Sequence, residues 1–230
     1  ALRPLALDLL ALDLVALATV ADVAPLIGVN RALVRQGLVV MGRRARPGLV
    51  ALADAAQLNR APTAYSLGYV LGPRINAGGR VGRADLGARL LSTADPHEAR
   101  SLADKLEALN ADRRMVESEV QAAAMDQAEG RSSDGALVWA AADGWHPGVV
   151  GIVASRLKER FHRPAVVIGF DGETGKGSGR SVNGVDLGAS VQRLVAEGLL
   201  EKGGGHKMAA GLSLSRTQLD AAMARLDALL

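Results

Sequence analysis

The segment Gly175–Ser181 reads GKGSGRS and alternates glycines with hydrogen-bond donors. In a β-strand, Lys176, Ser178 and Arg180 would share one face, because successive side chains point to opposite sides of a sheet. An ammonium, a hydroxyl and a guanidinium in a row suit the phosphate backbone of a nucleic acid. The segment is not a P-loop, because Gly177 follows Lys176 where that motif has Ser or Thr. A glycine-rich hairpin edge without a ligand is the alternative interpretation.

Three glycines stand in a row in the motif GGGHK. Consecutive glycines cost backbone entropy, so a folded protein places them where side chains would collide. We expect a turn whose backbone N–H groups at Gly203, Gly204 and Gly205 form an anion-binding nest. His206 and Lys207 would add donors at its edge. The alternative is a flexible turn followed by a core histidine.

A third candidate anion site is the motif DGWHPGVVGIVASRL, in which small residues open a helical pattern. The N-terminus of a helix attracts anions through its unpaired N–H groups. His146 stands just before this helix, and Arg156 lies about three turns along it. Tight packing of a helix on a sheet is the alternative explanation for Gly148 and Gly151.

The first half of the chain offers two further candidates. The motif GPRINAGGR carries Arg74, Asn76 and Arg80, and we expect a loop that grips phosphate; a solvated turn is the alternative. Asp22 is a lone carboxylate between apolar residues. Such an aspartate is costly to bury unless it caps a helix, pairs with a cation or binds a metal. From the residues alone we interpret it as a helix-end cap.

Helical spacing of apolar residues dominates the first 130 residues. Helices are expected over 4–18, from Asn30 to Val40 with Asn30 as the cap, over 48–58, over 62–71 and over 96–130. The last one has a strong start signal, in which Asp95 caps, Pro96 fits the first turn and Glu98 returns a capping-box bond. A helix of this length, about 45 Å, could join two domains; a plain core helix is the alternative.

After a polar linker at 130–135 the pattern changes to alternating strands and helices. Strands are expected at 136–142, 165–170, 176–182 and 208–214, and helices at 147–160, 187–199 and 217–229. This alternation predicts an α/β domain of about 95 residues.

The composition excludes several kinds of site. The 230 residues contain no cysteine, which rules out disulfides, thiolate metal sites and a cysteine nucleophile. The formal charge is +3, and 22 of the 27 basic residues are arginines. Arginine presents a planar fork that fits phosphate oxygens, although a GC-rich genome produces the same bias. Aromatic residues make up only 3%, so few rings are available to stack on bases.

The first 26 residues are apolar but contain Asp8, Asp13 and Asp22. They leave no uncharged stretch for a signal peptide or a membrane span. We therefore expect a soluble protein without a membrane partner, and a cytoplasmic location is compatible with the lack of cysteine. Ala1 is not an initiator Met and the chain begins inside a helical pattern, so we expect a piece of a longer protein.

Six segments of the chain, taken in order, resemble the RecJ exonucleases of the DHH phosphoesterase superfamily: DLVALATVADVAPL, GPRINAGGR, LNADRR, WHPGVVGIVASRLKER, GKGSGRS and GGGHKMAAGLSL. The resemblance implies an α/β architecture with the C-terminal part of a DHH domain (1–95), a long connecting helix (96–130) and a compact DHHA1 domain with a mixed sheet (135–230). It also implies 5′-to-3′ hydrolysis of single-stranded DNA in repair and recombination. The implied cofactor is Mn²⁺ or Mg²⁺, and an implied partner is a single-stranded-DNA-binding protein.

The resemblance also assigns roles to matching residues. Asp22 matches the last metal-binding aspartate of the DHH domain. Arg74 and Arg80 match a loop that contacts nucleotide near that site. The residues that match DNA-binding and phosphate-binding positions of the DHHA1 domain are Arg156, Ser178, Arg180 and His206.

The chain departs from the family pattern at the metal site. The Asp-His-His sequence that names the superfamily is absent, and no two of the four histidines are adjacent. A two-metal site needs several carboxylate and imidazole ligands, so we expect the full-length parent to be a nuclease and this chain alone to be inactive. Two alternatives stay open. One is a non-catalytic module that binds nucleic acid or a nucleotide, and the other is a DHH/DHHA1 phosphodiesterase of short oligonucleotides or cyclic dinucleotides.

Overall fold

The computed structural model describes residues 11–131 and 135–230. The chain divides into two compact units, Ala1–Arg113 and Arg114–Leu230, whose boundary falls inside one long helix. Among the described residues no helix combines the length and the apolar character that a membrane crossing requires.

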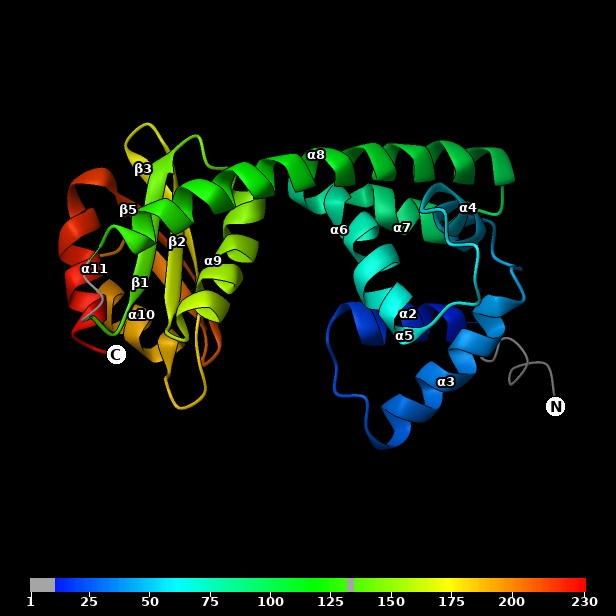
Figure 1. Cartoon of the computed structure of the whole chain (residues 1–230), viewed down its shortest axis with the longest axis horizontal. Coiled ribbons are helices and arrows are strands. Elements are labelled where there is room, and N and C mark those ends of the chain that lie inside the picture. The colour runs from blue at the N-terminus through cyan, green and yellow to red at the C-terminus, as the bar shows by residue number, and fades with distance from the viewer. Residues whose placement is uncertain (1–10, 132–134) are drawn as a thin grey trace. The chain divides into compact units, whose positions relative to one another are not determined.

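The first unit is helical. Its elements are α2 (Leu12–Ala21), α3 (Gly28–Gly42), α4 (Pro47–Ala55), α5 (Ala64–Ser66), the π-helix η1 (Leu67–Leu71), α6 (Gly72–Val81), α7 (Asp85–Ser92) and the first part of α8 (Pro96–Glu129) (Figure 1). The helices expected at 48–58 and 96–130 are confirmed as α4 and α8. The helix expected over 4–18 is observed from Leu12, and residues 4–10 of that prediction lie outside the described residues.

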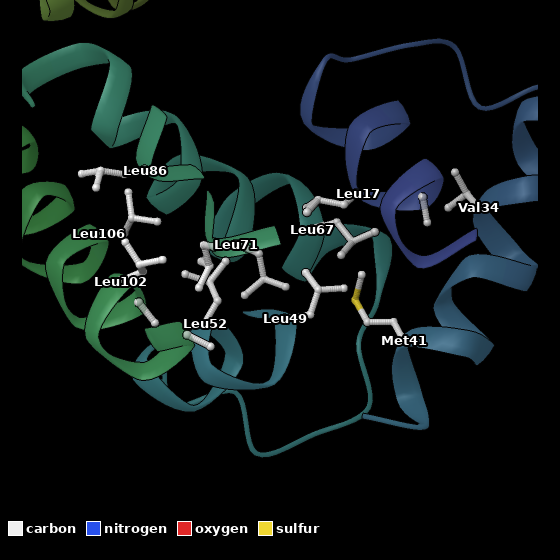
Figure 2. Packing of buried hydrophobic residues seen from close by; sticks show 14 residues of the cluster. Leu17, Val34, Met41, Leu49, Leu52, Leu67, Leu71, Leu86, Leu102 and Leu106 are labelled. Carbon is white, nitrogen blue, oxygen red and sulfur yellow. The ribbon is translucent and has the colours of Figure 1, made fainter. Parts of the chain in front are cut away.

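Leucine side chains form the core of this unit. Leu52, Leu71 and Leu106 are at most 1% exposed and come from α4, η1 and α8. Figure 2 shows them within one cluster that also holds side chains of α2 and α3. A fully buried leucine contributes about 1.5–3 kcal/mol, so this cluster holds α6, which directly follows η1, in a fixed place within the unit.

The segment GPRINAGGR is helix α6 and not the expected loop. Pro73 lies in the first turn, where its missing N–H leaves no bond unmade. Gly72 and Gly78 are buried, and a Cβ on either would lie 2.8 Å from a backbone oxygen. The residues that usually break helices are therefore present here because the helix starts at a proline and packs closely.

Two expected helix caps also differ from the structure. The N-terminus of α3 is Gly28, so Asn30 lies inside the first turn and donates from Nδ2 to the Pro25 carbonyl (3.1 Å) instead of capping. Glu98 does not return a capping-box bond, because its carboxylate accepts from the side chains of Arg89 and Thr93.

The second unit is an α/β domain with a five-stranded mixed sheet of order β1-β2-β3-β5-β4. Its elements are β1 (Val138–Asp143), α9 (Pro147–Phe161), β2 (Ala165–Asp171), β3 (Thr174–Arg180), α10 (Leu187–Ala196), β4 (Lys202–His206), β5 (Ala209–Ser215), the 3₁₀ turn η2 (Arg216–Gln218) and α11 (Leu219–Asp227). β1 pairs with β2 in parallel, and all other neighbours are antiparallel. The expected α/β architecture and the mixed sheet are confirmed.

Helices cover both faces of this sheet (Figure 1). On one face, α10 and α11 pack on side chains that include Ile168 and Leu212. On the other face, α9 and the last part of α8 pack on side chains that include Ala140 and Val167. The face that carries α9 is called the α9 face below.

Candidate nucleic-acid interface

Strand β3 separates its glycines from its donors, as expected. A Cβ on Gly175, Gly177 or Gly179 would lie 2.7–2.8 Å from side-chain atoms of core residues on the α10 side of the sheet. The glycines thus allow close packing on that side. Lys176, Ser178 and Arg180 alternate with them and point to the α9 face.

The first half of α9 packs directly on two of these donors. A Cβ on Gly151 would lie 2.9 Å from Arg180 Nη2 and 3.0 Å from Ser178 Oγ. Arg180 Nη1 donates to Ser178 Oγ (2.8 Å) and to the Gly179 carbonyl (2.9 Å). The absence of a side chain at position 151 therefore gives the guanidinium its place beside the serine.

The strand register extends this donor pair across the sheet. Ser178 is opposite Gly211, which is opposite Gly204, and Arg180 is opposite Ala209, which is opposite His206. Directly opposed residues share a face. A Cβ on Gly204 or Gly211 would meet no atom within 4 Å, so this part of the α9 face is open above a glycine floor.

Residues 203–206 of the motif GGGHK lie in strand β4 and do not form the expected turn. Successive N–H groups of a strand alternate between its two edges, so the predicted nest of three convergent N–H groups is absent. The glycines do lie where side chains would collide: a Cβ on Gly203 would be 2.6 Å from Val191, and one on Gly205 would be 2.2 Å from the Ala209 carbonyl.

Two exposed histidines use Nδ1 for a hydrogen bond with a nearby backbone N–H. His206 Nδ1 accepts the backbone N–H of Met208 (3.2 Å), and His146 Nδ1 accepts that of Gly148 (3.0 Å). In the neutral imidazole the remaining hydrogen then lies on Nε2. Both residues are exposed. Each can donate to an anion. His206 does so from the cross-strand row that also holds Arg180, with Ala209 between them, and His146 does so at the N-cap of α9.

Two of the predicted DNA-binding residues lie outside this arrangement. Arg156 is exposed on α9 and pairs with Glu159 of the same helix (3.3 Å). Lys207 lies in the two-residue turn between β4 and β5. The structure therefore places Ser178, Arg180 and His206 on two neighbouring cross-strand rows, and Arg156 and Lys207 lie outside these rows.

In the first unit, α6 places the arginines of GPRINAGGR on different sides. Asn76 and Arg80 are four residues apart and share a helix face. Arg74 points elsewhere: its guanidinium forms an ion pair with Glu107 and donates to the Val70 carbonyl (2.7 Å). Arg74 would have to leave these partners to reach a phosphate.

Asp22 stands at the C-cap of α2 and is exposed. Its carboxylate forms no hydrogen bond or ion pair among the described residues. The unpaired groups at a helix C-terminus are carbonyls, which a carboxylate cannot cap, and the helix dipole disfavours negative charge there. The position expected for Asp22 is thus observed, but its side chain does not stabilise the helix end.

The C-terminal end of α2, where Asp22 stands, packs on the start of α6, since a Cβ on Gly72 would lie 3.2 Å from Ala21 Cβ. No group of three or more His, Cys, Asp or Glu side chains that could hold a metal exists among the described residues. The residues present do not form a complete metal site, and Asp22 could supply only one ligand.

Two residues of the α9 face, Ser213 and Lys202, were not among the predicted site residues. Lys176 is opposite Ser213, which is opposite Lys202. The available signal was the alternation of Lys202, Gly204 and His206, which repeats the spacing of the donors in β3. It was hidden because three glycines suggested a turn.

A cavity of about 780 Å³ opens in the first unit beside the ion pair of Asp13 and Arg46. Arg46 donates to both carboxylate oxygens of Asp13 (2.8 and 3.1 Å). None of the predicted site residues lines this cavity, so it is separate from the candidate site.

Comparisons with known proteins define the class of the second unit. Residues 134–230 match the model of the DHHA1 domain. The class is therefore an α/β protein with a DHHA1 domain, in agreement with the mixed five-stranded sheet.

Longer matches to known proteins extend over most of the chain. The single-stranded-DNA-specific exonuclease RecJ of Dickeya dadantii is 46% identical over 215 residues, which are 88% of this chain and 37% of that protein. RecJ of Escherichia coli is 45% identical over 206 residues, or 85% and 36%. The crystal structure of Thermus thermophilus RecJ in complex with Mg²⁺ has a TM-score of 0.85 and 37% identity, over 96% of this chain and 34% of that chain.

The chain is a homologue of the RecJ exonucleases over most of its length. It spans about a third of the length of the curated relatives that it matches. A further RecJ structure, described as bound to manganese, has a TM-score of 0.81 and 38% identity and is covered over 54% of its length.

Proposed function

We propose that the chain is part of a metal-dependent 5′-to-3′ exonuclease of single-stranded DNA and supplies mainly its phosphate-binding surface. One observation carries the proposal: Arg180, Ser178 and His206 lie around an uncovered glycine floor on the α9 face. A guanidinium and two neutral donors suit a phosphodiester, and the missing side chains let a backbone approach closely.

The same geometry favours recognition of the DNA backbone over recognition of bases. The three donor residues are Arg, Ser and His, and no Phe, Tyr or Trp side chain belongs to the strand rows that hold them. Contacts to phosphate fix the strand without reading its sequence, as an exonuclease that digests any sequence requires. Repair and recombination, a cytoplasmic location and a single-stranded-DNA-binding protein as partner follow as proposals from the RecJ relatives.

The metal would belong to the longer parent. Two of the related RecJ structures are described as complexes with Mg²⁺ or with manganese. In this chain Asp22 would give one carboxylate ligand, and the remaining ligands would come from residues outside this sequence. The chain alone should therefore bind single-stranded DNA without cutting it.

Two measurements test this proposal. The purified chain should bind labelled single strands of unrelated sequence with similar affinity, and should release no mononucleotides with Mn²⁺. The full-length parent should digest the same strands progressively from the 5′ end. Failure of the chain to bind single strands would refute its binding role. Cleavage by the chain, free of contaminating nuclease, would refute the proposal that cleavage needs residues of the longer parent. Preference of the parent for di- or trinucleotides would instead support a phosphodiesterase of short oligonucleotides.

A further inference from the structure

Two lysines and a serine form a third row on the α9 face. Lys176 on β3, Ser213 on β5 and Lys202 on β4 are directly opposed across the three strands. Both lysines are exposed, and neither ammonium forms an ion pair or hydrogen bond among the described residues. Two positive charges are thus placed on either side of a hydroxyl, without a carboxylate paired to them.

This row ends beside the start of α9. Lys176 is opposite Gly169 of β2, and a Cβ on Gly169 would lie 2.0 Å from the Trp145 carbonyl oxygen. Trp145 directly precedes His146, which caps α9 through Nδ1 and has Nε2 free to donate. The backbone before α9 therefore covers the sheet at Gly169 of β2. The row of Lys176, Ser213 and Lys202 begins at the next strand, β3, and runs to β4.

The spacing of the rows suits one extended single strand of DNA. Residues two apart on a strand are separated by about 6.7 Å. Arg180, Ser178 and Lys176 follow one another at this step on β3, which is comparable to the separation of neighbouring phosphates in a stretched single strand. Arg180 and Ser178 share one hydrogen bond and so act as one phosphate site. Lys176 would belong to the next phosphate site along the DNA strand.

We propose that Lys176, Ser213 and Lys202 form a second phosphate subsite, which binds a neighbouring phosphodiester of the strand held by Arg180 and Ser178. This inference rests on the proposed function and adds that the bound DNA strand runs along β3. The two long side chains start on strands about 9.6 Å apart and can converge on one phosphate above Ser213. Because phosphate contacts carry no base information, the subsite should act on every sequence.

A purely protective role for the lysines makes different predictions. β4 is an edge strand, and lysines on edge strands discourage pairing with other chains. In that case removal of Lys202, the one of the two lysines on β4, would promote self-association. Loss of both lysines would then change the salt dependence of DNA binding no more than loss of any other two lysines.

The test is a salt titration of DNA binding by the 230-residue chain. The variant K176Q/K202Q is compared with wild type and with K105Q/K158Q, which removes two lysines of α8 and α9 and the same net charge. The probe is a 5′-phosphorylated oligothymidylate of about ten nucleotides, within the range of known single-strand sites. The slope of log affinity against log salt should flatten by about 1.4 in K176Q/K202Q, which is about 0.7 for each lost contact.

A mononucleotide probe tests the two-subsite arrangement. Thymidine 5′-monophosphate has a single phosphate, so K176Q/K202Q should bind it with the wild-type affinity, while R180A should bind it more weakly. Ser213→Ala should weaken binding of the oligonucleotide without a change of slope, because a neutral donor releases no counterion. Melting curves of each variant verify that it is folded.

The outcomes separate this inference from the proposed function. If K176Q/K202Q has the same salt slope as K105Q/K158Q, the second subsite is refuted. It is also refuted if K176Q/K202Q loses as much affinity for the mononucleotide as for the oligonucleotide. Weakening of oligonucleotide binding by R180A alone would leave the proposed function in place. If wild type binds neither probe, both the proposed function and the subsite are wrong.

Discussion

Arg180 Nη1 donates to Ser178 Oγ over 2.8 Å, between side chains two residues apart on the same strand. Because the serine oxygen accepts this bond, its own hydrogen is free to point toward a ligand. An arginine guanidinium has five N–H groups, so an arriving anion could compete for some of those that Arg180 now directs to oxygens of the protein. One hydrogen bond within the protein thus orients two donors toward one anion before it binds.

The first prediction concerns Arg180→Ala. Single-strand binding should weaken by about 1.5–3 kcal/mol, the range for a hydrogen bond to a charged group, and equally for unrelated sequences. The slope of log affinity against log salt should flatten by about 0.7. Arg100→Ala, at an exposed position of α8, is the control for loss of one charge. A lower melting temperature with an unchanged slope would instead give Arg180 a role in the fold alone.

The second prediction concerns Gly151→Ala. The new methyl group would lie 2.9 Å from Arg180 Nη2, the mobile end of a long side chain, so the guanidinium should move and the helix should remain. DNA affinity should fall while the melting temperature holds or rises, because alanine favours a helix over glycine by about 0.5–1 kcal/mol. Gly79→Ala in α6, where a Cβ has a neighbour only at 4.0 Å, controls for the helix effect. Unchanged DNA affinity in Gly151→Ala would contradict the placement of Arg180 by α9.

Side-chain alternation explains which strands could be predicted. β3 was recognisable because Lys176, Ser178 and Arg180 alternate with glycines, and β2 because an apolar run predicts a buried strand. In β4 the central three residues are glycines and carry no alternation, so only Lys202 and His206 mark its face. β4 pairs with β5 across the two-residue turn at Lys207 and Met208, but the three glycines give this hairpin no side-chain pattern by which the sequence could reveal it.

The error at GPRINAGGR has a related cause. Glycine and proline break helices on average, but Gly72 and Gly78 are buried against backbone oxygens and Pro73 is in the first turn. Tertiary packing thus overrides the local preference. The same reason applies to the candidate site: residue types indicated Arg180 and Ser178, whereas Ser213 became visible only through the strand register.

The third prediction concerns Asp22→Asn. In the full-length parent, cleavage should be lost and DNA binding retained, if Asp22 holds a metal. In this chain the same substitution should leave stability unchanged or raise it by about 0.3–1 kcal/mol, because it removes a negative charge from a helix C-terminus. Product release by the parent and urea unfolding of the chain measure the two effects. Normal turnover in the parent would remove Asp22 from the metal site.

Glu197 provides a prediction about stability at acid pH. Its carboxylate accepts from Nε and Nη2 of Arg225 on α11 (both 2.8 Å) and from Nε of Arg193 on α10 (3.0 Å). The hydrogen bonds from Arg225 and then Arg193 lower the pKa of Glu197 from 4.5 to about 2. A lowered pKa stabilises the fold above the unfolded value, and this contribution is lost as the pH falls from 4.5 toward 2.

The fourth prediction is therefore that Glu197→Gln destabilises the chain near neutral pH and that its difference from wild type shrinks as the pH falls from 4.5 toward 2. Urea midpoints measured across this range give the difference directly, even though other carboxylates titrate in both proteins. Glu119→Gln, at an exposed position of α8 without an ion pair among the described residues, is the charge-matched control and should show a smaller, flatter difference. A difference for Glu197→Gln that stays constant with pH would show that glutamine disturbs packing between α10 and α11 instead of removing a titrating ion pair.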